Sequence, residues 1–492
     1  MKEKLTALVS GFILGSVWLA GVPPVDGATA TNDWGNYPQG ARVILENTAP
    51  LQYPLGARLP LFLWPAHDAI VEDASLQESI VRDLNARGVA VIASWQPGTD
   101  RDRSLQSALQ VGRIQERLGL KVCVNANACM YGFYTGDPDT AHLDESGHTF
   151  FDDSLPGGKM GCPFRVKHRF AAVREQISFF LKGYQKEGVT VDFVYGDWEI
   201  DGPMEVNRAW DSARRCVVCR RNIAGIDDFR VFQAAVRRAR NDATRICYTE
   251  PILERFPNAM VGNYGVYPND GYRYWFDYFE TIHGDQPHRK EERAIYREWP
   301  NDFSETGYTL AMPVIYPWAR IYDWYEFPAS DVRWFHNMLL IASSAGRNTK
   351  AATPLVPFIH WQTVFDPDPE NDRVRQMSEV AYREMLWHSL LRGMDSFFMW
   401  CVVEQSAREV RLVHAAWAES LEWREWFEKG EFLRFDTPVM GHPVVSAVRF
   451  NERVLVRRTD FNQDHPEPVE MIVAGQILRI ARKEGNQVLR IP

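Results

Sequence analysis

The chain has 492 residues, a formal net charge of −9 and an aromatic content of 13%. A mildly acidic chain without runs of Lys and Arg is a poor candidate for binding nucleic acid, so we expect no nucleic-acid partner. The length is too great for one small core and favours a large domain with an accessory domain. The many aromatic residues, which include 17 Trp, are typical of proteins that stack rings on sugars, although core packing is the common use of such rings.

The amino terminus has the pattern of a secretory signal peptide. Lys2 and Lys4 precede a mostly apolar run over residues 5–22, and Ala28-Thr-Ala30 offers a cleavage site between small residues. We therefore expect residues 1–30 to be removed from a secreted or periplasmic protein, with an uncleaved anchor as the alternative. No other apolar run is long enough to span a bilayer, so we expect no membrane span after cleavage.

Strand-like and helix-like segments alternate through most of the chain. The expected strands cover residues 58–64, 89–94, 120–125, 191–202, 260–264, 309–316, 354–361 and 395–400. Helical patterns cover residues 75–87, 104–118, 168–187, 227–243, 331–345, 373–391 and 410–429. This order predicts an α/β fold, namely a (β/α)8 TIM-type barrel, over residues 31–430.

From about residue 431 the pattern changes to short runs in which apolar and polar residues alternate. These runs cover residues 446–450, 453–458, 470–474, 476–481 and 487–491, with turn residues between them. Such alternation predicts a small antiparallel β domain, similar to a β-sandwich, over residues 431–492.

The fourth expected strand is the best candidate for the chemistry. It begins with apolar residues at Val191 and ends with Asp197, Glu199 and Asp201 at alternate positions, before Gly202. Because side chains alternate faces along a strand, the three carboxylates would point the same way if the strand continued. Catalytic residues of parallel barrels lie at the carboxyl ends of strands, so we predict a catalytic site here. A strand that runs into a solvated acidic turn is the alternative.

The other strand ends carry mostly aromatic side chains, namely Trp64, Tyr264, Tyr316, Trp361 and Trp400. Core packing would explain each ring alone, but the pattern across five strands indicates a binding cleft for a neutral or weakly charged sugar. We expect no cofactor and no metal ligands among these residues.

The two acidic residues nearest the strand suggest a particular mechanism. Glycoside cleavage normally uses two carboxyl groups that flank the sugar, and Asp197 and Glu199 are poorly placed for that because they are two apart on one strand. In the substrate-assisted route, an N-acetyl group of the substrate attacks the reacting carbon instead. Glu199 would then be the general acid and Asp197 would orient the acetamide. Tyr264 and Tyr316 would contact the acetamide or the developing charge, and Trp400 would form the floor under the sugar.

Several short motifs resemble those of hyaluronidase-type glycoside hydrolases and occur in the same order. They are Leu61-Phe-Leu-Trp64, Asp197-Trp-Glu199, Gly262-Asn-Tyr-Gly-Val-Tyr-Pro268, Ile315-Tyr-Pro317 and Phe398-Met-Trp400. The wider chitinase-like clan carries Asp-x-x-Asp-x-Asp-x-Glu on its fourth strand. The same frame here is Asp192-x-x-Tyr195-x-Asp197-x-Glu199, with Tyr195 in place of the middle Asp.

The resemblance covers about residues 58–405 and implies the same barrel fold and the same roles for Glu199 and Asp197. It also implies a subsite lined by Tyr264, Tyr316 and Trp400. Hyaluronidases cut a polyanion with the help of basic groups, and no basic cluster is found at these strand ends. We therefore predict a secreted, endo-acting glycoside hydrolase for a polysaccharide that contains N-acetylhexosamine, without naming the polymer.

Two other functions fit the same residues. One is an ordinary retaining glycosidase that acts on a non-acetylated polysaccharide, with its nucleophile among Glu250, Asp323, Asp366 and Glu404. The other is a barrel that binds carbohydrate without cleaving it, which the intact Asp-x-Glu motif disfavours.

The seven cysteines form a separate feature of the sequence: Cys123, Cys129, Cys162, Cys216, Cys219, Cys247 and Cys401. The spacing of Cys216-Val-Val-Cys219, in an expected loop, suits a disulfide, a metal site or a redox pair. A local disulfide or another structural crosslink is favoured. A zinc site would need two more ligands, for which the first three cysteines are only loose candidates.

Overall fold

The computed structural model describes residues 34–152, 160–198, 207–265, 303–316, 330–349, 352–361, 376–462 and 465–491. The expected signal peptide over residues 1–30 lies outside the described residues. So do four carboxylates named above, Glu199, Asp201, Asp323 and Asp366.

Eight parallel strands form two four-stranded sheets, and each strand lies within one of the predicted ranges. The first sheet has the order β1 (Phe62–Leu63), β10 (Phe398–Met399), β9 (Phe358–Ile359) and β8 (Val314–Ile315). The second has the order β2 (Ile92–Ser94), β3 (Cys123–Asn125), β6 (Phe193–Gly196) and β7 (Met260–Asn263). The predicted class of an α/β fold with parallel strands is thus confirmed.

Backbone hydrogen bonds also connect the two sheets at both pairs of outer strands. Next to β1 and β2, Leu61 N–H donates to Gly88 at 2.9 Å, and Ala90 N–H donates to the Leu61 carbonyl at 3.0 Å. Next to β7 and β8, the N–H groups of Thr309 and Leu310 donate to the Val261 carbonyl.

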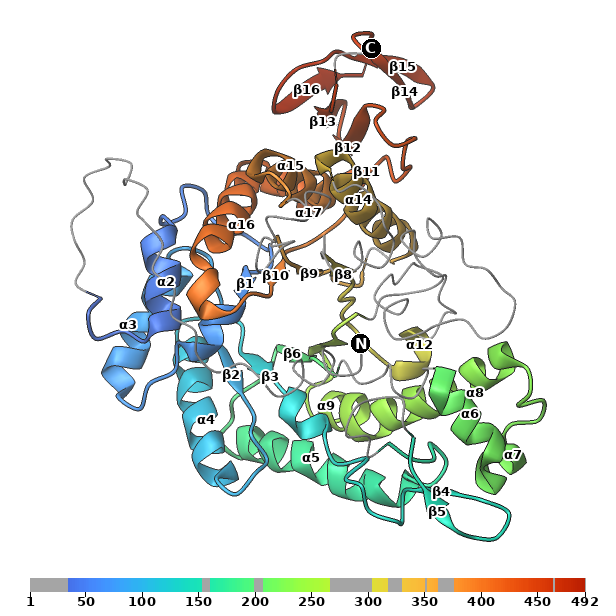
Figure 1. Cartoon of the computed structure of the whole chain (residues 1–492). Coiled ribbons are helices and arrows are strands. Elements are labelled where there is room, and N and C mark those ends of the chain that lie inside the picture. Colours follow the sequence, from blue (N-terminus) through green and yellow to red (C-terminus); the bar gives the residue numbers. More distant parts are fainter. Residues whose placement is uncertain are drawn as a thin grey trace, which may run out of the picture.

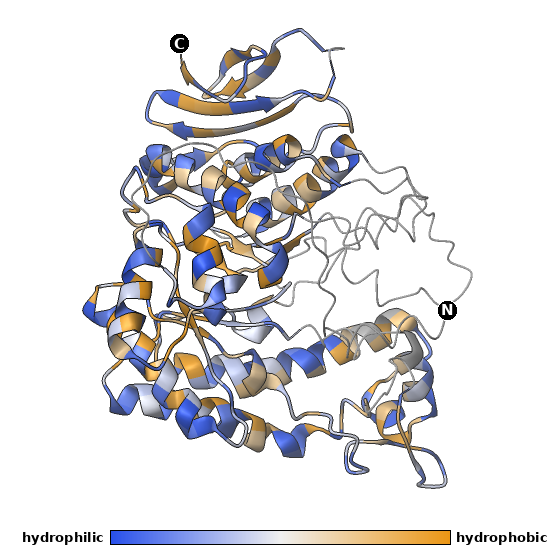
Figure 2. Cartoon of the chain, turned by 60° about the vertical axis from the view of Figure 1, so that its left-hand side comes forward, coloured by the Kyte–Doolittle hydropathy of each residue, from blue (hydrophilic) through white to orange (hydrophobic). Residues whose placement is uncertain are grey.

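Aromatic side chains fill the space between the two sheets. Phe62 of β1 stacks on Phe193 of β6 with ring centroids 4.2 Å apart. The Tyr195 ring lies 4.5 Å from Phe398 and 6.1 Å from Phe358. Each contact joins a strand of one sheet to a strand of the other, and the strands are largely hydrophobic (Figure 2). The inner faces of the two sheets therefore share one core.

Helices surround these strands, and most agree with the predicted ranges (Figure 1). They are α3 (Ala74–Asn85), α4 (Arg101–Arg117), α5 (Phe170–Lys186), α8 (Phe229–Thr244), α14 (Asp331–Asn348), α15 (Glu379–Leu390) and α16 (Ala407–Ser420). Capping side chains explain where two of these helices begin, because Asp73 accepts the Leu76 N–H of α3 and Ser378 accepts the Ala381 N–H of α15. Among the described helices, none is long and apolar enough to cross a membrane.

Several shorter elements were not predicted. They are α2 (Gln39–Asn47), β4 (His142–Leu143), β5 (Thr149–Phe150), α6 (Asn207–Arg215), α7 (Val217–Asn222), the π-helical turn η5 (Arg245–Thr249), α9 (Glu250–Leu253) and α12 (Phe303–Thr306). The helix predicted over residues 410–429 is divided, with α17 (Arg424–Lys429) as its second part. The prediction that Cys216 and Cys219 lie in a loop is therefore wrong, because helices α6 and α7 flank Cys216 and Cys219 lies in α7. Their buried residues form a small core of their own, which local periodicity over six to nine residues does not signal.

The predicted antiparallel strands at the carboxyl terminus are confirmed. One sheet has the order β11 (Glu431–Phe432), β12 (Val444–Phe450), β13 (Arg453–Thr459) and β16 (Asn486–Arg490). A hairpin of β14 (Val469–Val473) and β15 (Gln476–Ile480) lies beside it. The domain boundary near residue 431 stays a prediction.

Strand β12 buries both of its faces. Val444 and Val448 belong to the core that the parallel strands and helices share, whereas Val445 and Ala447 belong to a smaller core with β14 and β15. This is the period of two that a strand imposes on its side chains. The carboxyl-terminal strands therefore pack directly against the rest of the molecule.

Candidate active site

The fourth predicted strand is shorter than expected and ends in a turn that an Asn side chain holds by a hydrogen bond. Strand β6 stops at Gly196, which pairs with Asn263 of β7, so Asp197 and Trp198 follow the strand and do not extend it. The Asn263 Oδ1 atom accepts the Trp198 N–H at 2.9 Å. A Cβ atom on residue 196 would lie 3.0 Å from that oxygen, so glycine permits the close approach.

The inner face of β6 leads directly to Asp197. Phe193 and Tyr195 lie in the shared aromatic core, and Asp197 comes two residues after Tyr195, directly after the end of the strand. Burial and then the charge of Asp197 raise the pKa of Tyr195 well above its ordinary value. Glu199 lies outside the described residues.

Tyr195 occupies the place of the middle Asp in the clan motif and has an internal partner. Its hydroxyl forms a hydrogen bond with His67 Nε2, in the short helix η1 (Trp64–Asp68) after β1. The other ring nitrogen, Nδ1, lies 2.9 Å from the Trp64 carbonyl, so Nδ1 donates and Nε2 accepts. Burial lowers the pKa of His67 to about 4, so the ring is neutral at neutral pH. His67 was missed in the sequence, although it lies just after the first strand.

Three of the predicted aromatic residues meet at the ends of β7, β8 and β10. The Tyr316 ring lies 6.4 Å from Tyr264 and 6.5 Å from Trp400. His360, which follows β9 and was not predicted, lies 5.7 Å from Tyr316 and 5.0 Å from Trp400. Because Tyr264 N–H donates to the Gly196 carbonyl at 2.9 Å, this cluster begins directly beside the end of β6.

The buried carboxylate of Glu409, on a neighbouring helix, forms hydrogen bonds next to this cluster. Glu409 of α16 accepts the Trp361 N–H at 2.6 Å and the Tyr382 hydroxyl at 3.2 Å. His360 Nδ1 lies 3.1 Å from the same carboxylate and donates to it. Glu409 thus orients the imidazole ring of His360, which lies edge-on to Trp400. No pattern along α16 marks this residue as part of a site.

The two remaining predicted tryptophans lie elsewhere. The Trp361 indole N–H donates to the Met377 carbonyl at 2.9 Å, and its ring contacts Arg408 of α16. Its described contacts are therefore with the helix layer. Trp64 lies at the start of η1, with its ring 4.7 Å from His67. Sugar binding by either residue stays a prediction.

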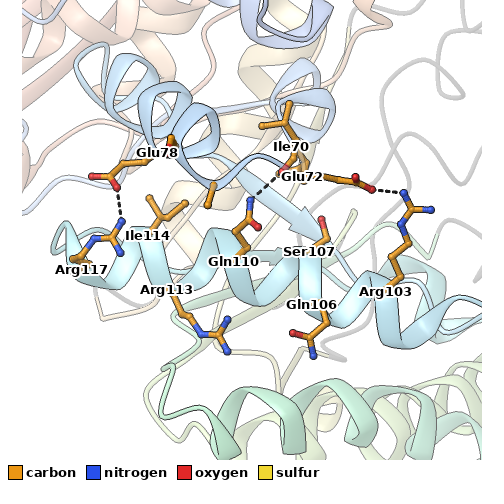
Figure 3. Close-up of a pocket in the computed structure, with 13 residues that line it drawn as sticks. Ile70, Glu72, Glu78, Arg103, Gln106, Ser107, Gln110, Arg113, Ile114 and Arg117 are labelled. Carbon is orange, nitrogen blue, oxygen red and sulfur yellow. Dashed lines mark hydrogen bonds and ion pairs between the residues drawn. The ribbon is translucent and has the colours of Figure 1, made fainter.

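Two cavities lie on the side of β1 and β2. One of about 550 Å³ adjoins the strand ends, and its lining includes His67, Ser94 and Gln96. A second, of about 780 Å³, lies between α3 and α4, and Figure 3 shows that Glu78 and Arg117 in its lining already pair with each other. Only the first of these two cavities borders the strand ends.

Two of the candidate nucleophiles of the two-carboxylate mechanism, Glu250 and Glu404, lie within the described residues and have different surroundings. Glu250 forms ion pairs with Arg245 and Arg174 at the start of α9. Glu404 is exposed in the short helix η6 (Val403–Gln405), which follows β10 at the same edge as the aromatic cluster. Burial and then the charge of Glu404 raise the pKa of Asp68, so these two carboxylates lie near each other.

A scan of protein-family models finds no match, and a search of curated protein sequences finds none either. Among solved structures, the chain is similar to a GH36 α-galactosidase from Geobacillus stearothermophilus in complex with stachyose, with 11% identity and a TM-score of 0.41. It is also similar to α-L-fucosidase isoenzyme 2 from Paenibacillus thiaminolyticus (12%, 0.38) and to a GH30 endoxylanase from Clostridium papyrosolvens (9%, 0.32). The matches cover 91%, 70% and 90% of this chain, and 57%, 45% and 97% of the other chains.

The chain thus spans about half of the length of the galactosidase and of the fucosidase. All three neighbours are glycoside hydrolases by name, but TM-scores this low carry no argument. None of the three is a hyaluronidase, and the resemblance to that family stays a prediction.

Proposed function

We propose that the two parallel sheets close into one eight-stranded (β/α) barrel. The hydrogen bonds beside Leu61 and Val261 support closure, because they connect the outer strands of the two sheets at both sides. The stacking of Phe62 on Phe193 supports it as well, because β2 and β3 separate β1 from β6 along that path. In such a barrel the end of β6 and the Tyr264–Tyr316–Trp400 cluster face one cleft.

The protein is, on this proposal, a secreted glycoside hydrolase that cleaves a polysaccharide containing N-acetylhexosamine. The observation that carries the proposal is the position of Asp197. It directly follows Gly196, whose carbonyl accepts the Tyr264 N–H, and Tyr264 belongs to the cluster with Tyr316 and Trp400, which offer a phenol and an indole face. Carboxylate, phenols and an aromatic floor are what a bound N-acetylated sugar needs.

The proposed reaction proceeds in two steps. The acetamide oxygen of the substrate bonds to the anomeric carbon while Glu199 gives its proton to the departing glycosidic oxygen. Asp197 accepts a hydrogen bond from the acetamide N–H and holds its oxygen in position for attack. Glu199 then takes a proton from the water that attacks the same carbon, which releases the acetamide with retained configuration.

The test uses N-acetylated polysaccharides and the same polymers after chemical removal of the acetyl groups. We expect cleavage of the acetylated forms alone, and a loss of at least about 100-fold in kcat for Glu199→Gln and Asp197→Asn. Glu187→Gln, which changes an exposed carboxylate paired with Arg113, is the matched control and should retain activity. Cleavage of the deacetylated polymers would contradict the substrate-assisted route.

Product sizes test the proposal of endo action. Cleavage within the polymer gives long fragments early in the digestion, whereas monosaccharide alone at early times would contradict it.

The ordinary retaining mechanism remains the second candidate because Glu404 lies at the same edge as the aromatic cluster. In that mechanism Glu404→Gln would abolish activity and trapping of a covalent glycosyl-enzyme would label this residue. In the substrate-assisted route the same substitution leaves the chemical step in place.

A further inference from the structure

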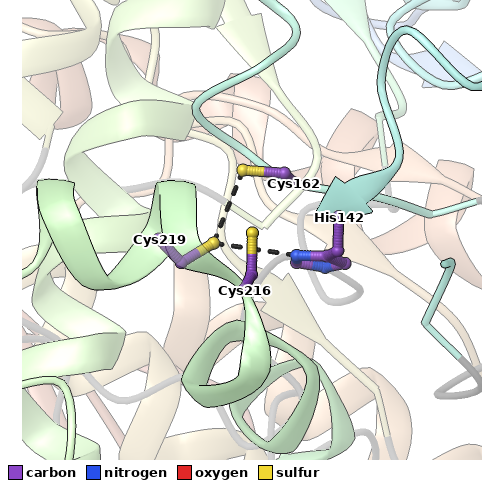
Figure 4. A group of neighbouring side chains, drawn as sticks. All are labelled: His142, Cys162, Cys216 and Cys219. Atoms are coloured by element: carbon purple, nitrogen blue, oxygen red, sulfur yellow. Dashed lines mark hydrogen bonds between the residues drawn. The ribbon is translucent and has the colours of Figure 1, made fainter. Parts of the chain in front are cut away.

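Three cysteines and one histidine from distant parts of the chain meet at one point. His142 begins β4, Cys162 precedes α5, and Cys216 and Cys219 lie at the start of α7. The three thiol sulfurs and a ring nitrogen all lie within 4.8 Å of one another. All four residues are at most 1% exposed, and their side chains converge (Figure 4).

The spacing fits a tetrahedral metal ion. Ligand atoms bound to one Zn²⁺ at about 2.0–2.3 Å lie about 3.3–3.8 Å apart at the corners of a tetrahedron. The Sγ atoms of Cys162 and Cys219 are 3.4 Å apart, and Cys219 Sγ is 3.7 Å from His142 Nδ1. The favoured expectation of a disulfide at Cys216 and Cys219 is wrong for this structure, in which all seven cysteines are free. A pairwise crosslink cannot account for three thiols around one imidazole.

The surroundings of the cluster resemble an outer ligand shell. The second ring nitrogen of His142, Nε2, lies 3.1 Å from Asp152 Oδ1, and both side chains are buried. Zinc-bound imidazoles usually donate their second N–H to a carboxylate in this way. The Leu143 N–H also donates to Cys216 Sγ at 3.5 Å. The cluster therefore has the features of a ligand set and not only of packed thiols.

The backbone brings these segments together closely enough to prearrange the ligands. Cys162 N–H donates to the Thr140 carbonyl at 2.9 Å. A Cβ atom on residue 161 would lie 2.1 Å from the same carbonyl, so only glycine fits before Cys162. His142 and Cys162 are thus fixed relative to each other because the backbone segments that carry them lie side by side.

A structural role follows from the small size of the local core. The buried residues around the cluster, which include Trp210 and Phe232, form a core separate from that of the parallel strands. Small cores gain much of their stability from a bound metal or a crosslink. Complete burial also hinders thiol exchange with external partners, which disfavours a redox role for Cys216 and Cys219.

We propose that His142, Cys162, Cys216 and Cys219 bind one structural zinc ion. The set of three thiolates and one imidazole is closed and tetrahedral, which is typical of structural zinc and unsuitable for Mg²⁺ or Ca²⁺. The ion joins the segment after β3 to helices α6 and α7, which follow β6.

Metal analysis of the purified full chain provides the first test. We expect one zinc per chain by mass spectrometry of the native protein, and X-ray absorption at the zinc edge should show three sulfur neighbours and one nitrogen neighbour. Zinc-free protein, a disulfide among Cys162, Cys216 and Cys219, or a zinc ion bound only by oxygen would each overturn the proposal.

Three variants refine the test. Cys216→Ser should lose the zinc, whereas Cys247→Ser, which changes a buried thiol outside the cluster, should retain it. Asp152→Asn should weaken zinc binding by about 10- to 100-fold, as changes to outer partners of ligating histidines do. If Cys216→Ser fails to fold, the absorption spectrum of the Co²⁺-substituted wild-type chain decides. A spectrum without the intense bands of tetrahedral thiolate coordination would contradict the proposed ligand set.

Discussion

Single side chains hold the turn that carries Asp197. Asn263 uses its Oδ1 to accept the Trp198 N–H and its Nδ2 to donate to the Tyr264 carbonyl. Its side chain thus connects the end of β6 to the end of β7 at the position where the proposed catalytic residues begin. Since Asn263 is only 4% exposed, water does not readily replace these bonds.

Replacement of Asn263 by Ala should lower the free energy of unfolding by about 1–3 kcal/mol, because a buried backbone N–H loses its acceptor. Urea-induced unfolding provides the measurement. Asn222→Ala is the control, because this exposed side chain contacts only the Val218 carbonyl of its own helix and should change stability by less than about 0.5 kcal/mol. Equal effects of the two substitutions would show that Asn263 does not lock the turn.

At the scale of elements, helix α15 is the surface on which the carboxyl-terminal sheet rests. Glu384 accepts bonds from Arg457 and from the Thr459 hydroxyl of β13, while His388 of the same helix contacts Ser446 of β12 at 2.8 Å. Arg457 is 8% exposed and Glu384 21% exposed, so solvent screens this ion pair only partly.

The Glu384–Arg457 pair should make stability depend on pH. Burial alone would raise the pKa of Glu384, but the hydrogen bond and charge of Arg457 outweigh it and hold the pKa below the ordinary value of 4.5. A depressed native pKa stabilises the fold fully above the unfolded-state pKa, and this contribution is lost as pH falls through the native pKa. The stability advantage of wild type over Glu384→Gln should therefore shrink below about pH 4.5.

Near neutral pH, Glu384→Gln should lower stability by about 3 kcal/mol, since Arg457 stays partly buried without its counter-charge. The matched control is Glu419→Gln, which breaks the exposed Arg383–Glu419 pair between α15 and α16 and should have an effect below about 1 kcal/mol. Thermal unfolding from pH 3 to pH 7 would compare the two. A pH-independent difference for Glu384→Gln would refute the linkage.

At the scale of the whole molecule, the carboxyl-terminal strands complete the main core. Val444, Val448 and Leu455 belong to the same buried cluster as the parallel strands and their helices. The fully buried Arg392, which follows α15, donates to Ser446 and to the Asp436 carbonyl. An accessory domain on a flexible linker would make no such contacts.

A chain that ends at Gly430 should therefore be poorly soluble and lose cooperative unfolding. Exposure of the face that buries the three apolar residues removes more than about 5 kcal/mol, close to the total stability of an ordinary domain. Solubility and calorimetry would measure the effect. Ile472→Ser, on the exposed face of β14, is the control that should leave unfolding unchanged. Unaltered unfolding of the shortened chain would mean that the strands are an independent module.

The residue pattern alone predicted the parallel strands, most of the long helices and several residues of the candidate cleft. Apolar runs predicted all eight parallel strands and helical periodicity predicted the long helices, because both patterns reflect burial along the chain. The expectation that the site lies at strand ends also singled out Tyr264, Tyr316 and Trp400, which form one cluster in the structure. The strand length at Asp197 was overestimated, because the bond from Trp198 to Asn263 is a contact between distant residues.

Which residues from distant parts of the chain lie together is seen only in the folded molecule. His142 and Cys162 have no local spacing that relates them to Cys216 and Cys219, and Glu409 lies on a helix 49 positions after His360. Hydrogen bonds and metal ligands depend on distances in space, which the chain sets through the packing of whole elements. Periodicity along the sequence reports which face of an element is buried, but it does not report which partner meets that face.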